Sequence, residues 1–235
     1  EELGKYTGKE YIVKTIVTTE LLFDIADKFN VKKFDVLTGF KFIADKILNN
    51  PDHTFICGGE ESYGFLIGDF VRDKDANSAC FMIAEIAAWA AERSKTLYQI
   101  LKEIYVEFGL YKEGLISLTK KGISGTEEIK QIMHHFRTEP PKEILNSKVV
   151  EIKDYKEGKS KNLDLDIETV INLPKSDVLQ FLTEDGTKIS VRPSGTEPKI
   201  KFYFGIKEKL SDISDYDIVN AELDNKLNKL AQLFS

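Results

Sequence analysis

The chain has 235 residues, of which 42% are apolar, so it can bury a substantial core as one large domain or two ordinary ones. Asp and Glu total 39 against 33 Lys and Arg, and the resulting net charge of -6 argues against nucleic acid as a partner. The sequence also lacks the run of about 18 apolar residues that would span a membrane.

The chain's two cysteines, Cys57 and Cys80, do not have the spacing of a metal site or of a disulfide framework. Their apolar surroundings, together with the absence of a signal peptide or lipidation motif, indicate a reduced, cytoplasmic compartment. The sequence begins at Glu1 without a methionine. This start suggests a fragment of a longer protein.

The first third of the chain alternates strand and helix. Residues 11–17 and 33–37 are rich in β-branched and aromatic side chains, and residues 54–57 form a third such run. Helices are predicted between them because apolar residues recur at helical spacing, first at Leu21, Leu22, Ile25, Ala26 and Phe29, then at Phe40, Ile43, Ala44, Ile47 and Leu48. The short links imply right-handed crossovers and a mostly parallel sheet.

Two loops should open at the same edge of this sheet. Thr38 and Gly39 follow the second strand, and residues 58–62 follow the third. Ligands of such sheets bind beyond the carboxyl ends of the strands. Glu60 and Ser62 can hydrogen-bond to paired hydroxyls such as those of a sugar, and the paired glycines let the backbone come close. The alternative is that Glu60 and Glu61 are solvated loop acids.

A charged turn at residues 72–75 leads into the second part of the first domain. If residues 77–93 form a helix, apolar side chains lie on nearly all its sides, which predicts that the helix is buried. Thr96 and Gln99 form a capping box, and the helix that they begin ends at Gly109. Residues 110–119 are interpreted as an extended connector, which divides the chain into domains of residues 1–118 and 119–235.

The second half is predicted to be a two-layer domain. A helix capped by Thr126 comes first, and a strand follows at residues 148–155. His134 and His135 are adjacent on the helix and point in different directions, so a metal role is not expected. Asp164 and Asp166 are placed on one solvated face of a strand.

A terminal helix from residue 214 should pack on an antiparallel sheet that contains an Asp185-Gly186 hairpin. Two strands of that sheet flank the loop Arg192-Pro193-Ser194-Gly195-Thr196-Glu197-Pro198. Its composition suits an anion, because Arg192 offers a planar fork of donors, Ser194 and Thr196 add hydroxyls, and Gly195 exposes backbone N–H groups. Phosphate is the natural ligand. The alternative is a tight turn whose arginine pairs with a neighbouring carboxylate.

Three segments resemble one enzyme family. Val191 to Tyr203, V-R-P-S-G-T-E-P-K-I-K-F-Y, is similar to the phosphate-binding loop in the last domain of the α-D-phosphohexomutases, the phosphoglucomutase and phosphomannomutase family. Cys57 to Gly64, C-G-G-E-E-S-Y-G, resembles the sugar-binding loop of the third domain, and Leu37 to Ile43, L-T-G-F-K-F-I, resembles the loop before it. The three segments occur in family order.

The resemblance implies a fold and a set of binding residues. The expected fold is a three-layer α/β domain with a mostly parallel sheet, followed by a smaller two-layer α+β domain with an antiparallel sheet, similar to the TATA-binding protein. The implied sugar-binding residues are Thr38, Gly39, Glu60, Ser62 and Lys74, and the implied phosphate-binding residues are Arg192, Ser194, Gly195 and Thr196.

The resemblance also implies an activity. Family members move a phosphoryl group between two positions of one sugar through a phosphoserine and a bisphosphate, with Mg²⁺ and an activator of the glucose 1,6-bisphosphate type. This sequence lacks the family's Thr-Ala-Ser-His-Asn-type phosphoserine loop and its Asp-x-Asp-x-Asp-Arg magnesium loop. No Arg follows the acids near Asp166, and they come after the sugar loop, so they are not assigned to the metal.

The interpretation is therefore the substrate-binding carboxyl half of a phosphosugar mutase of the phosphoglucomutase or phosphopentomutase-like branch. Its expected partners are a phosphosugar and the missing N-terminal domains, and by itself it should be inactive. One alternative is a stand-alone phosphosugar-binding or regulatory module without catalysis. A third reading is a phosphatase or kinase that shares only the phosphate-binding loop of residues 192–198. This reading does not explain why a segment like the family's sugar-binding loop precedes it in family order. Glucose, mannose, a pentose and an amino sugar all remain compatible with these residues.

Overall fold

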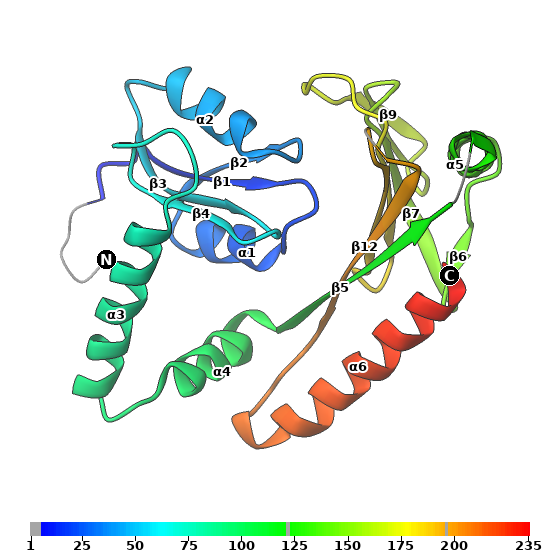
Figure 1. Cartoon of the computed structure of the whole chain (residues 1–235). Coiled ribbons are helices and arrows are strands. Elements are labelled where there is room, and N and C mark those ends of the chain that lie inside the picture. The colour runs from blue at the N-terminus through cyan, green and yellow to red at the C-terminus, as the bar shows by residue number, and fades with distance from the viewer. Residues whose placement is uncertain (1–5, 121–122, 196) are drawn as a thin grey trace. The chain divides into compact units, whose positions relative to one another are not determined.

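The computed structural model describes residues 6–120, 123–195 and 197–235, and the chain divides into two compact units (Figure 1). Unit 1 runs to Gly109 and includes Leu210–Ile213, and unit 2 contains Leu110–Lys209 and Ser214–Ser235. The division thus falls after Gly109, whereas the sequence analysis places a domain boundary between residues 118 and 119. The physical reason is that residues 110–119 form a strand of the sheet in unit 2.

Unit 1 is built on a sheet with the strand order β2-β1-β3-β4. Its strands are β1 (Glu10–Thr15), β2 (Lys32–Val36), β3 (Thr54–Glu60) and β4 (Gly64–Ile67). β1 pairs in parallel with both β2 and β3, and β4 returns antiparallel to β3. The helices α1 (Leu21–Lys28) and α2 (Phe40–Leu48) are the crossovers. The mostly parallel sheet predicted from the sequence is confirmed.

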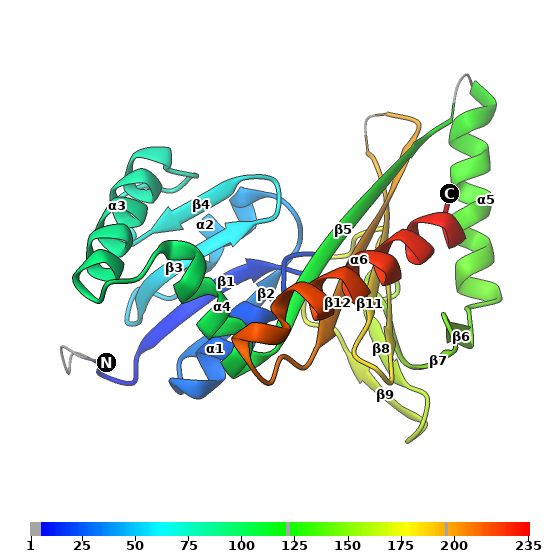
Figure 2. The ribbon, with the colours of Figure 1, turned by 90° about the horizontal axis from the view of Figure 1, so that it is seen from below.

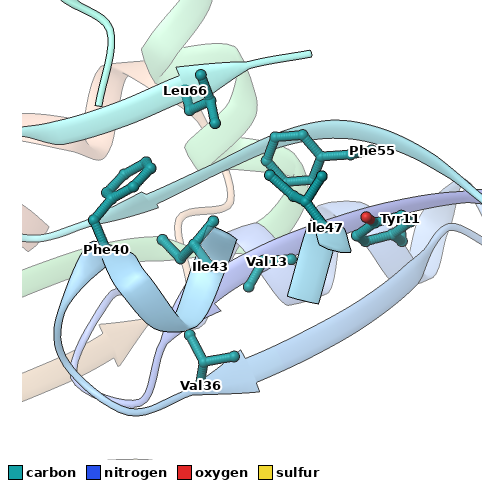
Figure 3. Packing of buried hydrophobic residues seen from close by; sticks show 8 residues of the cluster. All are labelled: Tyr11, Val13, Val36, Phe40, Ile43, Ile47, Phe55 and Leu66. Carbon is teal, nitrogen blue, oxygen red and sulfur yellow. The ribbon is translucent and has the colours of Figure 1, made fainter. Parts of the chain in front are cut away.

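The core of unit 1 lies between α2 and one face of this sheet (Figure 3). Strands and helix contribute apolar side chains that are at most 5% exposed, and burial of each stabilises the fold by about 1.5–3 kcal/mol. Eight of them form one cluster: Tyr11, Val13, Val36, Phe40, Ile43, Ile47, Phe55 and Leu66. This face is apolar because alternate residues of a strand point to the same side of the sheet.

The opposite face of β1 carries a buried charge. The side chain of Lys14 is 0% exposed, and its Nζ lies 2.7 Å from Asp35 Oδ1 and 3.1 Å from Glu20 Oε1. The ammonium also lies 4.2 Å from the ring centroid of Phe23 in α1. A buried ammonium is tolerated only when it is paired, so this arrangement fixes α1 against the sheet.

The paired glycines of the sugar loop belong to the strand β3. A Cβ atom on Gly58 would lie 2.6 Å from the carbonyl oxygen of Val13, and one on Gly59 would lie 2.8 Å from the carbonyl oxygen of Gly64. The missing side chains therefore make room for neighbouring protein backbone. Both glycines also line the cavity that contains Glu60, so the expectation that they let a ligand approach the backbone stays a prediction.

Two further helices complete unit 1, α3 (Ala76–Glu92) and α4 (Leu97–Phe108). The capping box of α4 is confirmed, since Thr96 and Gln99 exchange side-chain and backbone hydrogen bonds and the helix ends at Gly109. The prediction that α3 is buried is wrong. Its one buried residue is Ala90, while Phe81 is 64% and Ile83 is 55% exposed.

Unit 2 contains an antiparallel sheet with the strand order β5-β12-β11-β10-β7-β8-β9. The strands are β5 (Leu110–Thr119), β7 (Ser147–Asp154), β8 (Lys159–Asn162), β9 (Ile167–Val170), β10 (Leu179–Thr183), β11 (Lys188–Pro193) and β12 (Lys199–Glu208). A short strand β6 (Glu143–Ile144) pairs with β7, and the 3-10 turn η1 (Ile213–Asp215) precedes the last helix. The predicted hairpin at Asp185-Gly186 joins β10 and β11, and Gly186 has the positive φ of 78° that its turn needs.

The helices α5 (Ile123–Thr138) and α6 (Tyr216–Leu233) pack on this sheet, as Figure 2 shows. Phe136 of α5 contacts Phe181 and Phe202 of the sheet, with ring centroids 5.8 Å and 6.2 Å apart. Phe234, directly after α6, lies 5.3 Å from Phe202. The expected two layers are therefore present, held together by aromatic side chains. Within the described residues no helix is both long and apolar enough to cross a membrane.

Two local predictions for unit 2 are wrong. α5 begins at Ile123, so Thr126 lies inside the helix and is not its cap. Asp164 and Asp166 lie in the turn between β8 and β9 and not on a strand. That turn forms because the Asn162 side chain accepts hydrogen bonds from the backbone N–H groups of Asp164 and Leu165, which competes with strand pairing.

Candidate functional site

Residues 192–198, which we call the anion loop, connect β11 to β12 in unit 2. Arg192 and Pro193 end β11 and pair with Lys201 and Ile200 of β12, so both ends of the loop are held by the sheet. The Ser194 N–H donates to the Lys199 carbonyl oxygen at 2.7 Å, and the Glu197 N–H donates to Ser194 Oγ at 3.3 Å. Thr196 lies outside the described residues. The two ends of the loop are thus fixed by strand pairing and by these two hydrogen bonds.

A cavity of about 370 Å³ lies against this loop. Arg192, Ser194 and Gly195 line it, which brings together three of the residues that the sequence assigns to phosphate. The cavity is also lined by residues that sequence reasoning missed, namely Thr126, Ile129 and Lys130 of α5, with Ser176 and Asp177. These lie apart from the loop in sequence, so only the tertiary structure, which brings α5 and the segment before β10 next to the loop, could reveal them.

The acidic side chains of the cavity are paired with cations. Asp177 Oδ1 lies 2.5 Å from Arg137 Nη2, and Arg137 Nε lies 2.9 Å from Asp154. Glu197 pairs with Lys199 at 3.2 Å. In the described part of the chain no carboxylate lies within ion-pair distance of Arg192. The alternative in which this arginine is neutralised within a tight turn is not what the structure shows.

Lys130 adds a second cation to the cavity. Its Nζ lies 3.3 Å from Glu127, one turn away on the exposed side of α5. An exposed pair of this kind contributes about 0–1 kcal/mol, so an incoming anion can recruit the ammonium at little cost. With Arg192 it makes the cavity a match for a phosphate group.

Residues 57–64, which we call the sugar loop, comprise the end of β3, the turn that follows it and the first residue of β4 in unit 1. Glu60 is the last residue of β3, and its side chain is 10% exposed. Lys74 Nζ lies 3.8 Å from Glu60 Oε1 and 5.4 Å from the ring centroid of Phe40, the residue directly after Gly39. The structure thus places Glu60 and Lys74 beside each other and close to the start of α2.

The other predicted residues of unit 1 lie nearby along the backbone. Thr38 and Gly39 follow β2 at the same carboxyl edge of the sheet, and Gly39 precedes α2 with a φ of 120°. Ser62 and Tyr63 form the exposed tip of the hairpin, where Tyr63 has a φ of 63°. A Cβ atom on Gly64 would lie 2.6 Å from Glu60 Cγ, so this glycine leaves room for the carboxylate.

Glu61, to which the sequence assigns no binding role, hydrogen-bonds within its own unit. Its Oε2 accepts hydrogen bonds from Thr15 Oγ1 at 3.2 Å and from Thr18 Oγ1 at 3.5 Å. Glu60 and Glu61 nevertheless share one cavity of about 420 Å³, together with Thr18, Tyr63 and Cys57. Burial raises the pKa of the Cys57 thiol to about 11, which keeps it protonated and unreactive at neutral pH.

The acidic side chains of the described residues do not gather into a cluster of metal ligands. Among residues 6–120, 123–195 and 197–235, no three His, Cys, Asp or Glu side chains gather in a way that could hold a metal. Asp164 pairs with Lys148, and Asp166 pairs with Lys161 at 2.9 Å. Both aspartates are thus engaged in surface ion pairs of a hairpin.

Comparisons with known proteins match both units to one protein family. The family model "Phosphoglucomutase/phosphomannomutase, alpha/beta/alpha domain III" matches residues 1–108, and the model "Phosphoglucomutase/phosphomannomutase, C-terminal domain" matches residues 138–213. Phosphoglucomutases from Staphylococcus aureus strains MSSA476 and N315 are each 44% identical over 197 residues, which is 83% of this chain. The chain spans 36% of the length of these curated relatives.

Among solved structures, the open form of the exocytosis-sensitive phosphoprotein pp63/parafusin, a phosphoglucomutase from Paramecium, has a similar fold. The TM-score is 0.59 at 18% identity, over 92% of this chain and 37% of the other. This likeness concerns the fold alone. Because the two family models together match most of the sequence, the chain belongs to the phosphoglucomutase/phosphomannomutase family and carries the family's third domain and C-terminal domain.

Proposed function

We propose that this chain is the substrate-binding carboxyl part of a phosphosugar mutase. Such an isomerase moves a phosphoryl group between two positions of one sugar, as in the conversion of glucose 1-phosphate to glucose 6-phosphate, through a phosphoserine and a bisphosphate intermediate. Family membership and the names of the Staphylococcus relatives support this proposal. The cytoplasm, where phosphosugars are metabolised, is the proposed location.

The observation that carries the proposal is the cavity at the anion loop. Arg192 has no carboxylate partner there in the described residues, while Asp177 and Glu197 are held by Arg137 and Lys199. Arg192, Ser194 and Gly195, with Thr196 beside them in sequence, would bind the phosphate that does not react. Binding energy from such a remote group positions the reacting end of the substrate.

The sugar loop would bind the ring hydroxyls. Glu60 can accept hydrogen bonds, and Ser62 at the exposed tip can both donate and accept. The 3.8 Å between Lys74 Nζ and Glu60 Oε1 is long for an ion pair, and the Lys74 side chain is half exposed. The pair is therefore weak, and a polar ligand can replace either partner. Thr38 and Gly39 would contact the same ligand from the neighbouring strand end.

Neither task breaks a bond. The phosphoserine, the Mg²⁺ ion and an activator such as glucose 1,6-bisphosphate belong to the proposed chemistry of the complete mutase, and the residues described here supply no ligand set for the metal. The N-terminal domains of such a mutase would be the partners of this chain. We therefore expect the 235-residue chain to bind phosphosugar without turning it over.

Calorimetric titration with glucose 6-phosphate tests the binding. Arg192→Ala should weaken the affinity roughly tenfold or more, because a charge-assisted hydrogen bond to phosphate is lost. Arg93→Ala, which removes an exposed arginine of unit 1, is the matched control and should leave the affinity unchanged. Equal affinities of Arg192→Ala and the original chain would refute the assignment of the anion loop.

A coupled assay tests the expected lack of turnover. The chain is incubated with glucose 1-phosphate, a catalytic amount of glucose 1,6-bisphosphate and Mg²⁺, and formation of glucose 6-phosphate is followed. The product should stay at the level of a heat-inactivated sample. Conversion above that level would show that the chain contains a phosphoryl-transfer site of its own.

A further inference from the structure

An acidic side chain lies in the wall of the cavity at the anion loop. Asp177, in the segment before β10, lines this cavity together with Arg192 and Lys130. Its side chain is 44% exposed, so burial does not shield its charge from a ligand in the cavity. A free carboxylate at this place would repel an anion and would also compete with it for the two cations. A site for phosphate therefore needs a group that neutralises Asp177.

Arg137 is the cation that pairs with Asp177. Its Nη2 lies 2.5 Å from Asp177 Oδ1, and its Nε lies 2.9 Å from Asp154 Oδ2. Arg137 is the penultimate residue of α5, and Asp154 is the last residue of β7. The arginine thus joins α5, β7 and the segment before β10. Two of these three elements, α5 and the segment before β10, supply walls of the cavity.

The contacts of Arg137 hold its guanidinium in place. The side chains of Arg137 and Asp154 are each 17% exposed, and partial burial strengthens their pairing relative to that of a surface pair. Asp154 Oδ1 also accepts hydrogen bonds from the backbone N–H groups of Lys156 at 2.9 Å and Glu157 at 3.2 Å. Asp154 is therefore fixed by its own turn and anchors the arginine. Because an arginine stays protonated in proteins, Arg137 can neutralise Asp177 at any pH at which the chain is folded.

Among the described residues, those that line the cavity include Asp177 but neither Arg137 nor Asp154. We propose that Arg137 is a positioning residue that acts on the phosphate through Asp177. It holds the carboxylate in an ion pair and so leaves Arg192 and Lys130 for the anion. Without it, the carboxylate would pair with one of these cations in place of the phosphate. This inference rests on the proposed function, in which the cavity binds the phosphate of a sugar phosphate.

An alternative is that Arg137 serves only to fasten α5 to the sheet. Both roles predict that loss of the arginine weakens phosphate binding. Only the first predicts that binding returns when the charge of Asp177 is removed as well, because that second change restores no link between α5 and the sheet. Asp and Asn side chains have nearly the same shape, so Arg137→Gln and Arg137→Gln/Asp177→Asn differ in the charge of residue 177.

Calorimetric titration of the full 235-residue chain with glucose 6-phosphate at low ionic strength separates the two roles. Arg137→Gln should weaken the affinity about tenfold, because it releases a carboxylate beside the bound anion. Arg137→Gln/Asp177→Asn should return the affinity to within about threefold of that of the original chain. Asp177→Asn alone should raise the affinity, because the wall loses a negative charge while Arg137 keeps its positive one.

Two further measurements show whether charge is the cause. The two variants that lack Arg137 should have similar Tm values, since both have lost the link between α5 and β7, although their affinities differ. The ratio of the affinities of the original chain and of Arg137→Gln should also shrink as salt is added, because repulsion in an open cavity is screened.

Lys161→Gln is the matched control. It removes a lysine that pairs with Asp166 at 2.9 Å, and so releases an aspartate of the same unit. Asp166 does not line the cavity. The affinity of Lys161→Gln for glucose 6-phosphate should therefore equal that of the original chain, which would show that the effect depends on the place of the released carboxylate and not on net charge.

Two results would overturn the inference and leave the proposed function intact, provided that the original chain binds and Arg192→Ala binds more weakly. The first is an Arg137→Gln variant that binds as tightly as the original chain. The second is a double variant that binds as weakly as Arg137→Gln, which would mean that the arginine serves only the packing of α5. Absence of binding to the original chain would overturn the proposed function and this inference together.

Discussion

At the scale of single residues, charge pairing decides which side chains of the site can meet a ligand. Asp177 and Asp154 pair with Arg137, and Glu197 pairs with Lys199, so among the described residues Arg192 has no carboxylate partner. This arrangement supports the proposal that Arg192 binds an anion. In unit 1 the neighbouring residues Glu60 and Glu61 likewise differ in how firmly their carboxylates are paired. Glu61 accepts hydrogen bonds from two threonines of its own unit, while Glu60 Oε1 lies 3.8 Å from Lys74 Nζ, near the limit of an ion pair.

The hydrogen bonds of the Glu10 carboxylate can be tested through the pH dependence of stability. Its carboxylate accepts hydrogen bonds from the Thr7 N–H at 2.7 Å, from Thr7 Oγ1 at 2.9 Å and from the Gly8 N–H at 2.9 Å. These bonds, the one from the Thr7 backbone above all, lower its pKa from 4.5 to about 2. A lowered folded-state pKa contributes stability that is complete above pH 4.5 and is lost as the pH falls toward 2.

Glu10→Gln should therefore flatten the fall of Tm between pH 4.5 and 2, while lowering the Tm at neutral pH because the charged acceptor is gone. Thermal unfolding followed by circular dichroism over this pH range measures both effects. Glu222→Gln, which removes an exposed carboxylate of α6, controls for the loss of one charge. A pH profile of Glu10→Gln parallel to that of the original chain would contradict the assignment.

At the scale of elements, glycine serves different purposes in the strand β3 and in the anion loop. Gly58 lies within β3, where a Cβ atom would come within 2.6 Å of the backbone of β1, and Gly195 lies in the anion loop, where a Cβ atom would meet nothing within 4 Å. The first glycine permits strand pairing. The second leaves open space beside the cavity that we assign to phosphate.

Gly58→Ala should consequently destabilise unit 1 by about 1–3 kcal/mol, because the added methyl group forces β1 and β3 apart. Gly195→Ala should unfold at the same denaturant concentration as the original chain and should weaken binding of glucose 6-phosphate by narrowing the approach to the backbone. Urea unfolding and calorimetric titration of both variants measure the contrast. A stable Gly58→Ala variant would show that β3 can shift at little cost.

At the scale of the whole molecule, the chain contains two compact units that bury separate cores. The core of unit 1 forms between a mostly parallel sheet and α2, and that of unit 2 forms between an antiparallel sheet and the helices α5 and α6. Units with separate cores can unfold separately. A ligand that binds one of them stabilises that unit alone.

Inorganic phosphate should accordingly shift one of two calorimetric unfolding transitions. At about ten times its Kd it stabilises the unit that binds it by about 1.4 kcal/mol, which raises the Tm of that transition by roughly 5 °C. Gly58→Ala lowers the Tm of unit 1 and so identifies its transition, and phosphate should move the other one. Arg192→Ala should remove this shift. An equal shift of both transitions would place phosphate outside the anion loop.

The sequence by itself determined the features that depend on neighbouring residues. The alternating pattern of residues 11–57 predicted β1, α1, β2, α2 and β3, because apolar spacing dictates which face of an element is buried. The capping box at Thr96 and the turn at Asp185-Gly186 were predictable because their hydrogen bonds and backbone angles are local. The anion and sugar loops were found from their composition and their resemblance to one family.

Only the tertiary structure decided what depends on residues far apart in the chain. Lys130 lines the cavity of the anion loop because α5 packs on the sheet, and Asp177 lines it from the segment before β10. No local pattern in the sequence marks either residue. The exposure of α3 was likewise hidden, since an all-apolar pattern shows that a helix avoids water but not what covers it. Residues 110–119 formed a strand and not a connector because β12 supplies their hydrogen-bond partners, and a strand exists only where another one pairs with it.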